Sequence, residues 1–395
     1  MRFLHISDIH IGKVVNDFSM LEDQQFILEQ IAGIAQANAV DAVVIAGDVY
    51  DRAIPSGEAV TLFDKFLTRL SAQGIQVLII SGNHDSPERL SFGKQLFSRQ
   101  GIHIAGVPEG HPMTVEFQEL APGSVRKQIT TQFVLLPFMK PAQMDASTSE
   151  DAVKKALERY WAEEKTSGKK RKNRVLVTHF FVTDSGREPE LSDSETTVHV
   201  GGLDNVDASL FDGFDYTALG HIHKPQQVGQ HPVWYAGSPL KYSFGEAKQE
   251  KCVILVSMGE KGLLEVQTIL LRPMREMRRI YGSLNELLEA GWEDQGKEDY
   301  IQANLSDKGE LIDPIGTLRS VYPNVMQIVR NVEGQGIDCA GFETSQSRHL
   351  AEKKDMLALF ESFYLEIKGE ELSEDGKRIV ESLVKELEGQ EGTGT

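Results

Sequence analysis

One stretch decides how this chain folds: VLIISGNHD, residues 77–85. Four apolar residues in succession, 77–80, are typical of a strand that is buried on both faces of a parallel sheet. Gly82 permits a tight turn, and Ser86-Pro87-Glu88 is a helix-start pattern. A strand, a turn and a helix therefore frame a loop that carries three polar side chains.

The three polar side chains of this loop suit the chemistry of a phosphate ester beside a metal ion. Asn83 can offer an amide oxygen to a metal. His84 can hand a proton to a reacting phosphate, and Asp85 can hold the imidazole of His84 in one orientation. Because loops on a rigid frame commonly carry function, the stretch predicts a catalytic loop.

Other apolar runs along the chain end in side chains of the same kind. Five such runs end in groups able to bind a metal: Asp8 with His10, Asp48, Asn83, His179, and His221 with His223. Any one of them alone is more simply explained as a turn-forming Asp or as a surface or core His. The joint pattern favours a metal site, because the strand ends of an open α/β sheet line one crevice.

The spacing and the residue types indicate how such a site is built. Residues i and i+2 of an extended chain point to the same side, so Asp8 with His10, and likewise His221 with His223, are expected to face one ion. A carboxylate has two oxygens, so one aspartate can bridge two ions about 3.5–4 Å apart. Imidazoles, carboxylates and an amide suit Mn²⁺, Fe²⁺ or Zn²⁺ better than Mg²⁺ or Ca²⁺, and a set without Cys argues against structural zinc.

The alternation of strands with helices predicts an α/β sandwich for the first part of the chain. A composition shift near Arg272-Pro273 begins a smaller α/β unit, and two amphipathic helices follow a Gly-rich link. The predicted parts are a main domain 1–271, a small domain 272–331, a linker 332–346, C-terminal helices 347–388 and a disordered tail 389–395.

The net charge of −18 argues against a chain that holds nucleic acid by charge alone. It argues less against an enzyme whose metal ions touch the phosphate, because bound ions dominate the local field. Two basic clusters are either solvated surface or contacts for a phosphate backbone or an acidic partner. They are residues 169–174 and the set Arg272, Arg275, Arg278 and Arg279.

Localisation signals point to the cytoplasm. The chain begins with a strand pattern in place of a signal peptide, and no apolar run approaches the roughly 20 residues that span a bilayer. We therefore expect no membrane association. The two cysteines, Cys252 and Cys339, are isolated, so we expect reduced thiols.

The order of the motifs resembles that of the calcineurin-like metallophosphoesterases. The matching parts are DIH at 8–10, GD at 47–48, GNHD at 82–85, His179, and GHIH at 220–223. The resemblance implies a metallophosphoesterase β-sandwich flanked by helices, an α/β fold, with the small α/β unit as a capping domain and further helices at the C-terminus.

Finer features resemble one branch of that family, the nuclease subunits of bacterial SbcCD-type complexes. They are DIHIG at 8–12, GDVYD at 47–51 with Pro55-Ser56, and GSPLKYSF at 237–244. The chain departs at Asp51, where eukaryotic and archaeal relatives have His, and this leaves the role of Asp51 open.

The resemblance also implies roles for the matching residues. Two divalent metal ions are expected, with Mn²⁺ as the expected metal. One ion would be held by Asp8, His10, Asp48 and His223, and the other by Asp48, Asn83, His179 and His221. His84 would be the catalytic histidine, with Asp85 as the residue that orients it.

The function implied is a Mn²⁺-dependent DNA nuclease, a double-strand exonuclease and single-strand endonuclease in DNA repair and recombination. The implied partners are DNA, an SbcC-type coiled-coil ATPase docked on helices 347–388, and a second copy of the chain in a homodimer. Two alternatives stay open: another phosphoesterase acting on a small phosphodiester or a phosphoprotein, and a non-catalytic scaffold. The extra chain after Arg272 favours the nuclease, since a small-substrate hydrolase would not need it.

Overall fold

The computed structural model describes residues 1–120, 128–167, 172–192, 204–309 and 311–330, and the single residues 376, 377 and 380. The chain divides into two compact units, Met1–Val332 and Glu333–Thr395. The predicted linker, tail and Cys339 lie outside the described residues, as do the C-terminal helices apart from those three residues. In the described part, no helix is both long and apolar enough to cross a membrane.

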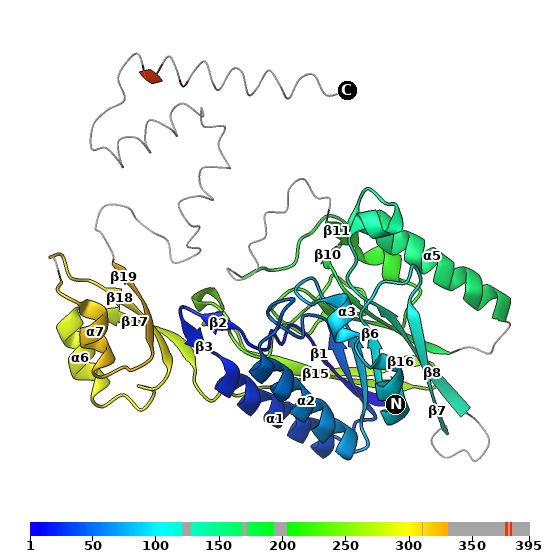
Figure 1. Cartoon of the computed structure of the whole chain (residues 1–395), viewed down its shortest axis with the longest axis horizontal. Coiled ribbons are helices and arrows are strands. Elements are labelled where there is room, and N and C mark those ends of the chain that lie inside the picture. The colour runs from blue at the N-terminus through cyan, green and yellow to red at the C-terminus, as the bar shows by residue number, and fades with distance from the viewer. Residues whose placement is uncertain are drawn as a thin grey trace. The chain divides into compact units, whose positions relative to one another are not determined.

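Two six-stranded sheets form the body of the first unit (Figure 1). The first sheet has the order β16-β15-β1-β4-β5-β6, in which β1, β4, β5 and β6 run parallel and β15 is antiparallel to both its neighbours. The bounds are β1 (Arg2–Ile6), β4 (Ala42–Ala46), β5 (Gln76–Ile80), β6 (Ile102–Ala105), β15 (Cys252–Gly259) and β16 (Gly262–Leu270).

The second sheet has the order β13-β14-β12-β9-β8-β7. Its four central strands run parallel, and the two edge strands β13 and β7 are antiparallel to their neighbours. The bounds are β7 (Met113–Leu120), β8 (Gln128–Leu136), β9 (Asn173–His179), β12 (Tyr216–Gly220), β13 (Gln226–Gln227) and β14 (Val233–Tyr235).

The two sheets pack face to face over an apolar core. Phe3 of β1 contacts Phe133 of β8 edge-to-face, with ring centroids 5.1 Å apart. The buried His5 crosses the same interface: its Nδ1 lies 3.0 Å from the Tyr216 hydroxyl and its Nε2 3.1 Å from the carbonyl oxygen of Leu219. This polar contact fixes β1 against β12, the two strands that precede Asp8 and His221.

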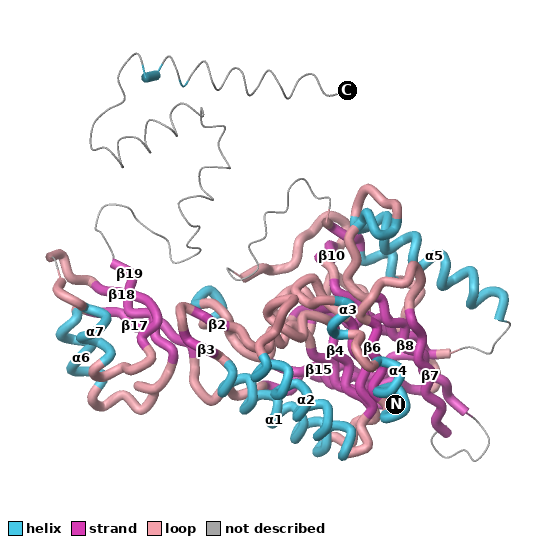
Figure 2. The backbone as a smooth tube through the Cα atoms, in the orientation of Figure 1, coloured by secondary structure: helices cyan, strands magenta, loops and turns pink. Residues whose placement is uncertain are grey.

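Helices cover the outer faces of the sandwich (Figure 2). On the first sheet lie α1 (Leu21–Ala37) and α2 (Gly57–Ala72), and on the second lies α5 (Ser149–Ser167). The Ser56 hydroxyl accepts from the Ala59 N–H and begins α2. Shorter elements are β2 (Val14–Val15), β3 (Phe18–Ser19), α3 (Pro87–Leu90), α4 (Lys94–Phe97), β10 (Phe181–Thr183) and β11 (Asn205–Asp207).

A small α/β unit follows the sandwich, with a core of its own. Its three-stranded sheet has the order β17-β18-β19, all parallel, with β17 (Met277–Gly282), β18 (Tyr300–Leu305) and β19 (Val325–Arg330). Helices α6 (Leu284–Gly291) and α7 (Pro314–Arg319) pack on this sheet. The sequence patterns do not indicate β17, because MRRIYG has two arginines and no apolar alternation.

Two of the four arginines of the second basic cluster are tied to carboxylates, which neither explanation from the sequence foresaw. Arg275 forms ion pairs of 2.6 Å with Glu22 and 2.8 Å with Asp23 on α1. Arg278 forms ion pairs of 2.6 Å with Asp294 and 2.8 Å with Asp299. A planar guanidinium can bind two carboxylates at once, so these two arginines hold the small unit together and to α1.

The described part of the first basic cluster is also paired within the protein. Lys172 is buried and lies 2.6 Å from Glu116 and 3.1 Å from Glu164. Arg174 lies 3.3 Å from Glu164 and stacks over the ring of Trp161. At residues 172 and 174 the cluster is therefore engaged with carboxylates of the protein itself.

Candidate metal centre

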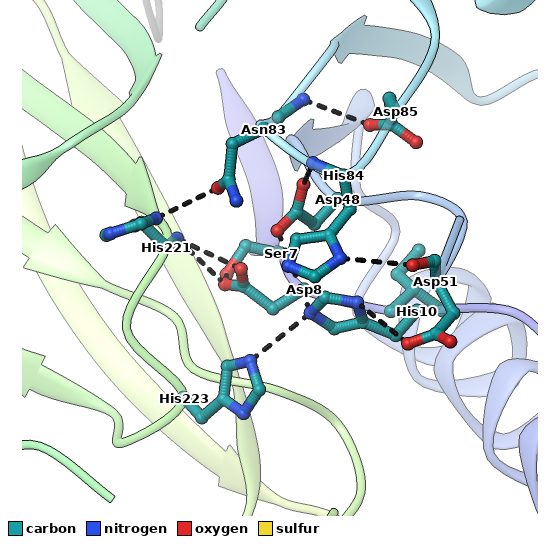
Figure 3. A network of polar contacts seen from close by, with 12 residues as sticks. Ser7, Asp8, His10, Asp48, Asp51, Asn83, His84, Asp85, His221 and His223 are labelled. Carbon is teal, nitrogen blue, oxygen red and sulfur yellow. Dashed lines mark hydrogen bonds and ion pairs between the residues drawn. The ribbon is translucent and has the colours of Figure 1, made fainter. Parts of the chain in front are cut away.

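The predicted metal ligands follow strands of both sheets, and the structure brings all seven together. Asp8 and His10 follow β1, Asp48 follows β4, and Asn83 follows β5. The second sheet contributes His179 at the end of β9, and His221 and His223 after β12. Figure 3 shows the side chains of these loops pointing toward a common space.

One set of ligand atoms lies around His10. The Nε2 atoms of His10 and His223 are 3.2 Å apart, and Asp8 offers a carboxylate oxygen within 4.8 Å of both imidazoles. Two atoms that bind one ion at about 2.1 Å lie roughly 3.0–3.4 Å apart at tetrahedral to octahedral angles. The His10–His223 spacing therefore fits a shared divalent ion.

A second set lies around Asn83. Its Oδ1 is 3.0 Å from Nε2 of His179 and 3.0 Å from Nδ1 of His221. The Nε2 of His179 is also 3.3 Å from Oδ2 of Asp48. These spacings match those of atoms around one ion, so the residues fit a second divalent metal.

Asp48 lies between the two sets, but it offers them one oxygen. Its Oδ1 accepts the backbone N–H of His84 at 2.9 Å. Its Oδ2 is 3.3 Å from Nε2 of His179 and 3.7 Å from Nε2 of His10. Asp48 therefore faces both sets with its Oδ2 atom, and not with one oxygen for each ion as its two oxygens suggested. A Cβ at Gly82 would lie 2.1 Å from Oδ1 of Asp48, so glycine is required there.

The backbone at the ligands is left-handed, which corrects the reason given for the pairing of Asp8 with His10. Their φ angles are 50° and 48°, so neither is extended chain. Asp48 at 49° and His221 at 102° also have positive φ, an unfavourable conformation for residues other than glycine. Strain of this kind persists where surrounding contacts hold it, and it is concentrated at functional sites.

Residues that the sequence reasoning missed hold this strained loop. Gln24 of α1 is buried, and its side-chain amide donates to the carbonyl oxygen of His10 at 2.8 Å. The Tyr242 hydroxyl donates to the carbonyl oxygen of Ile9. Tyr242 belongs to the GSPLKYSF motif, which was the available signal, whereas Gln24 sits in an ordinary helix and gave none.

His84 lies beside the metal ligands on the exposed side of the site. Its Nδ1–H donates to the carbonyl oxygen of Asp51 at 3.0 Å, which leaves Nε2 available for another contact. Its ring is packed edge-to-face on His10, with centroids 4.8 Å apart. Asn83 is exposed as well, and His221 is partly exposed, so this is the side from which a substrate can approach.

Asp85 does not touch the imidazole of His84, which contradicts the orienting role expected for it. Its buried carboxylate accepts the backbone N–H groups of Val49, Tyr50 and Gly82 at 3.0–3.1 Å. It therefore ties the loop after β4 to the loop after β5. The orienting bond comes from a main-chain carbonyl at residue 51, which no side-chain pattern in the sequence could indicate.

The electrostatics of the site favour a bound cation. Burial by itself would raise the pKa of the Asp48 carboxyl, but the charge and hydrogen bond of His179 and the charge of His10 hold it far below its usual range. Burial by itself would lower the pKa of His179, but Asp48 and Asp8 raise it to about 9. Without metal, a proton on His179 therefore balances buried negative charge, and a divalent ion can take its place.

Comparison with known proteins agrees with this geometry. A family model for calcineurin-like phosphoesterases matches residues 1–225, more than half of the chain, so the chain belongs to that family. It is accordingly a phosphoester-hydrolysing enzyme, and the predicted metallophosphoesterase fold is confirmed. A second model, for the type 5 capsule protein repressor C-terminal domain, matches residues 273–367.

Individual proteins also align with this chain. The SbcD subunit of the nuclease SbcCD from Staphylococcus epidermidis is 28% identical over 402 residues, which cover 99% of this chain and 100% of that protein. A dimetal phosphatase from Danio rerio is 14% identical, with a TM-score of 0.39 over 69% of this chain and 99% of its own. A protein of Thermus thermophilus has 12% identity and a TM-score of 0.39 over the same shares.

Proposed function

We propose that this chain is a dinuclear metal-dependent DNA nuclease, with both exonuclease and endonuclease activity, that acts in the cytoplasm in DNA repair and recombination. One observation carries the proposal: two sets of ligand atoms meet at Oδ2 of Asp48, in a chain similar over its full length to a nuclease subunit. The residues proposed to hold one ion are Asp8, His10, Asp48 and His223. Those proposed to hold the other are Asp48, Asn83, His179 and His221.

The proposed metal is Mn²⁺, which accepts the mixed imidazole, carboxylate and amide ligands. When bound, two such ions would supply an activated water and stabilisation of the charge that develops on a phosphodiester. His84 of the chain acts on the leaving group as the imidazolium: its Nδ1–H is held by the carbonyl oxygen of Asp51, and its exposed Nε2–H donates a proton to the departing oxygen. The role of Asp85 in this proposal is to hold the two loops that carry Asp48 and His84.

The alternative is a phosphoesterase that acts on a small phosphodiester or on a phosphoprotein. The ion pairs of Arg275 and Arg278 favour this alternative, because two of the four arginines considered as contacts for a phosphate backbone are engaged with carboxylates of the protein. Metal-free protein, reloaded with Mn²⁺, should be assayed on labelled duplex DNA, on single-stranded DNA and on a generic phosphodiester ester. We expect cleavage of both DNAs, and hydrolysis of the ester alone would establish the alternative.

The proposed partners follow the same resemblance. Residues 272–331 are proposed to cap DNA, the segment 347–388 to dock an SbcC-type ATPase with a coiled coil, and two copies of the chain to form a dimer. The segment carries an apolar stripe at helical spacing, at Leu350, Leu357, Phe360, Tyr364 and Ile367. Such a stripe suits a helix-in-groove contact with a partner.

Removal of residues from Ser347 onward should separate DNA cleavage from binding of the ATPase. We expect Mn²⁺-dependent cleavage of single-stranded DNA to be retained, because every proposed ligand lies before that residue. Co-purification with the ATPase, and ATP-dependent cleavage of duplex ends, should be lost. A truncated chain that still binds the ATPase would contradict the docking assignment, and one that unfolds would show that the segment packs on the rest of the chain.

A further inference from the structure

A buried ion pair lies directly behind the metal centre. Glu246 and Lys251 are 2.6 Å apart, and their side chains are 0% and 4% exposed. Removing two charges from water commonly costs more than the pair returns, so a buried pair is weak grounds for a stabilising role. The contacts of Glu246 and Lys251 with His223 indicate a role other than stabilisation of the fold.

Lys251 spans several oxygens next to the ligand His223. Its ammonium donates to the carbonyl oxygen of His223 at 2.9 Å and to the Ser238 hydroxyl at 3.0 Å. It also donates to the side-chain oxygen of Gln249 at 3.0 Å. The N–H of Ser238 donates to the same His223 carbonyl at 3.1 Å. The main chain of His223 is therefore fixed from two sides.

Glu246 holds the ring of the same histidine. One carboxylate oxygen, Oε2, binds Lys251, and the other, Oε1, lies 3.5 Å from Nδ1 of His223. A proton on Nδ1 then faces the carboxylate, and the lone pair of the ring is placed on Nε2. That Nε2 is the atom 3.2 Å from Nε2 of His10, at the first set of ligand atoms. Carboxylates behind metal-binding imidazoles act in this way in metal sites generally.

We propose that Glu246 and Lys251 form a positioning pair that fixes the ring orientation and tautomer of His223 for metal binding. The inference rests on the proposed function, because it takes His223 as a ligand. Glu246 sets the ring through Nδ1, and Lys251 holds both the carboxylate and the main chain of His223 in place. Neither residue touches the substrate, and both act through the imidazole.

Glu246→Gln tests the proposal by metal binding and not by activity. The full-length metal-free protein should be titrated with Mn²⁺, with the free ion counted by its EPR signal. We expect the unaltered chain to bind two ions and the variant to lose roughly 10–100-fold in affinity at one site, the usual effect of removing such a partner. Equal affinities at both sites in the two proteins would overturn the proposal.

A matched control is available at the Glu164–Lys172 pair, whose lysine is buried and whose charged atoms lie 3.1 Å apart, outside the metal centre. Glu164→Gln removes one of the two carboxylates that hold a buried lysine, so it should lower thermal stability while both Mn²⁺ affinities stay unchanged. A similar loss of affinity in this control would assign the effect at Glu246 to general destabilisation and overturn the positioning role.

A second variant and a spectroscopic measurement keep the proposal testable if Glu246→Gln does not fold. Glu246→Asp keeps the charge beside Lys251 but withdraws the carboxylate from Nδ1, and the same site should weaken. In ¹⁵N-histidine spectra of metal-free protein, His223 should carry its proton on Nδ1 and lose this preference in Glu246→Gln. An unchanged tautomer would count against the pair. Absence of Mn²⁺ binding by the unaltered chain would instead overturn the proposed function itself.

Discussion

Replacement of Asp48 by alanine is expected to remove both metal ions and to abolish nuclease activity. The Oδ2 atom of Asp48 is the one ligand atom shared by both sets, at 3.3 Å from His179 and 3.7 Å from His10. Metal ions supply several kcal/mol of transition-state stabilisation, so their loss should slow cleavage by at least about 10³-fold. Elemental analysis of the dialysed protein, alongside a Mn²⁺-dependent DNA cleavage assay, measures both effects.

His10→Ala is the matched comparison for that experiment. His10 contacts the first set of ligand atoms through His223, whereas Oδ1 of Asn83 in the second set lies 3.0 Å from ring nitrogens of His179 and His221. This variant should therefore lose affinity for one ion and keep the other. Two tightly held ions in Asp48→Ala would refute the bridging role, and loss of both ions in His10→Ala would show that the two sites do not form independently.

His84→Gln is expected to keep its metal while the cleavage rate falls by roughly 10²–10⁴-fold, the usual contribution of a positioned acid or base. The imidazole is exposed and its Nδ1 is bonded to the Asp51 carbonyl, so Nε2 is directed at the substrate side. The competing explanation is that His84 binds metal, since its ring nitrogen lies within 4.8 Å of ligand atoms of His10 and Asp48.

Metal content and single-turnover rate, measured on the same preparation, decide between these roles. Loss of one ion together with activity would make His84 a ligand. The exposed His111, outside the cluster, provides a control, and His111→Gln should change neither quantity. An ester with a good leaving group should also be less affected by His84→Gln than DNA is, because such a leaving group needs no proton.

The local parts of the fold could be predicted from the sequence. The apolar run 77–80 forms β5, Gly82 makes the turn, and Ser86 caps α3 by accepting the Arg89 N–H. These features depend on neighbours within a few residues, which is why short patterns reveal them. The strand β17 was missed for the opposite reason: Arg278 in that strand is satisfied by Asp294 and Asp299, more than ten residues further along the chain.

The metal centre also combines features that depend on residues nearby in the sequence with features that depend on distant ones. The sequence indicates which residue types meet at the site and which strands they follow, as at Asp8, Asp48, Asn83 and His179. The reason is that polar residues at the ends of buried strands have few other uses when five such strands occur together. The sequence did not indicate the geometry in which these residues meet. The expected extended geometry at Asp8 and His10 is absent, since both have φ near 50° and are held by Gln24 and Tyr242 from distant parts of the chain.

The sequence by itself determined the family, the strand–turn–helix framework and the identity of the residues that meet at the metal centre. Only the tertiary structure decided which oxygen of Asp48 faces both sets, which nitrogen of each histidine faces the metal site, and that a carbonyl and not Asp85 holds His84. It also revealed the Glu246–Lys251 pair behind His223. The physical reason is that hydrogen-bond direction and tautomer depend on the positions of atoms that are far apart in sequence, and a pattern along the chain carries no record of them.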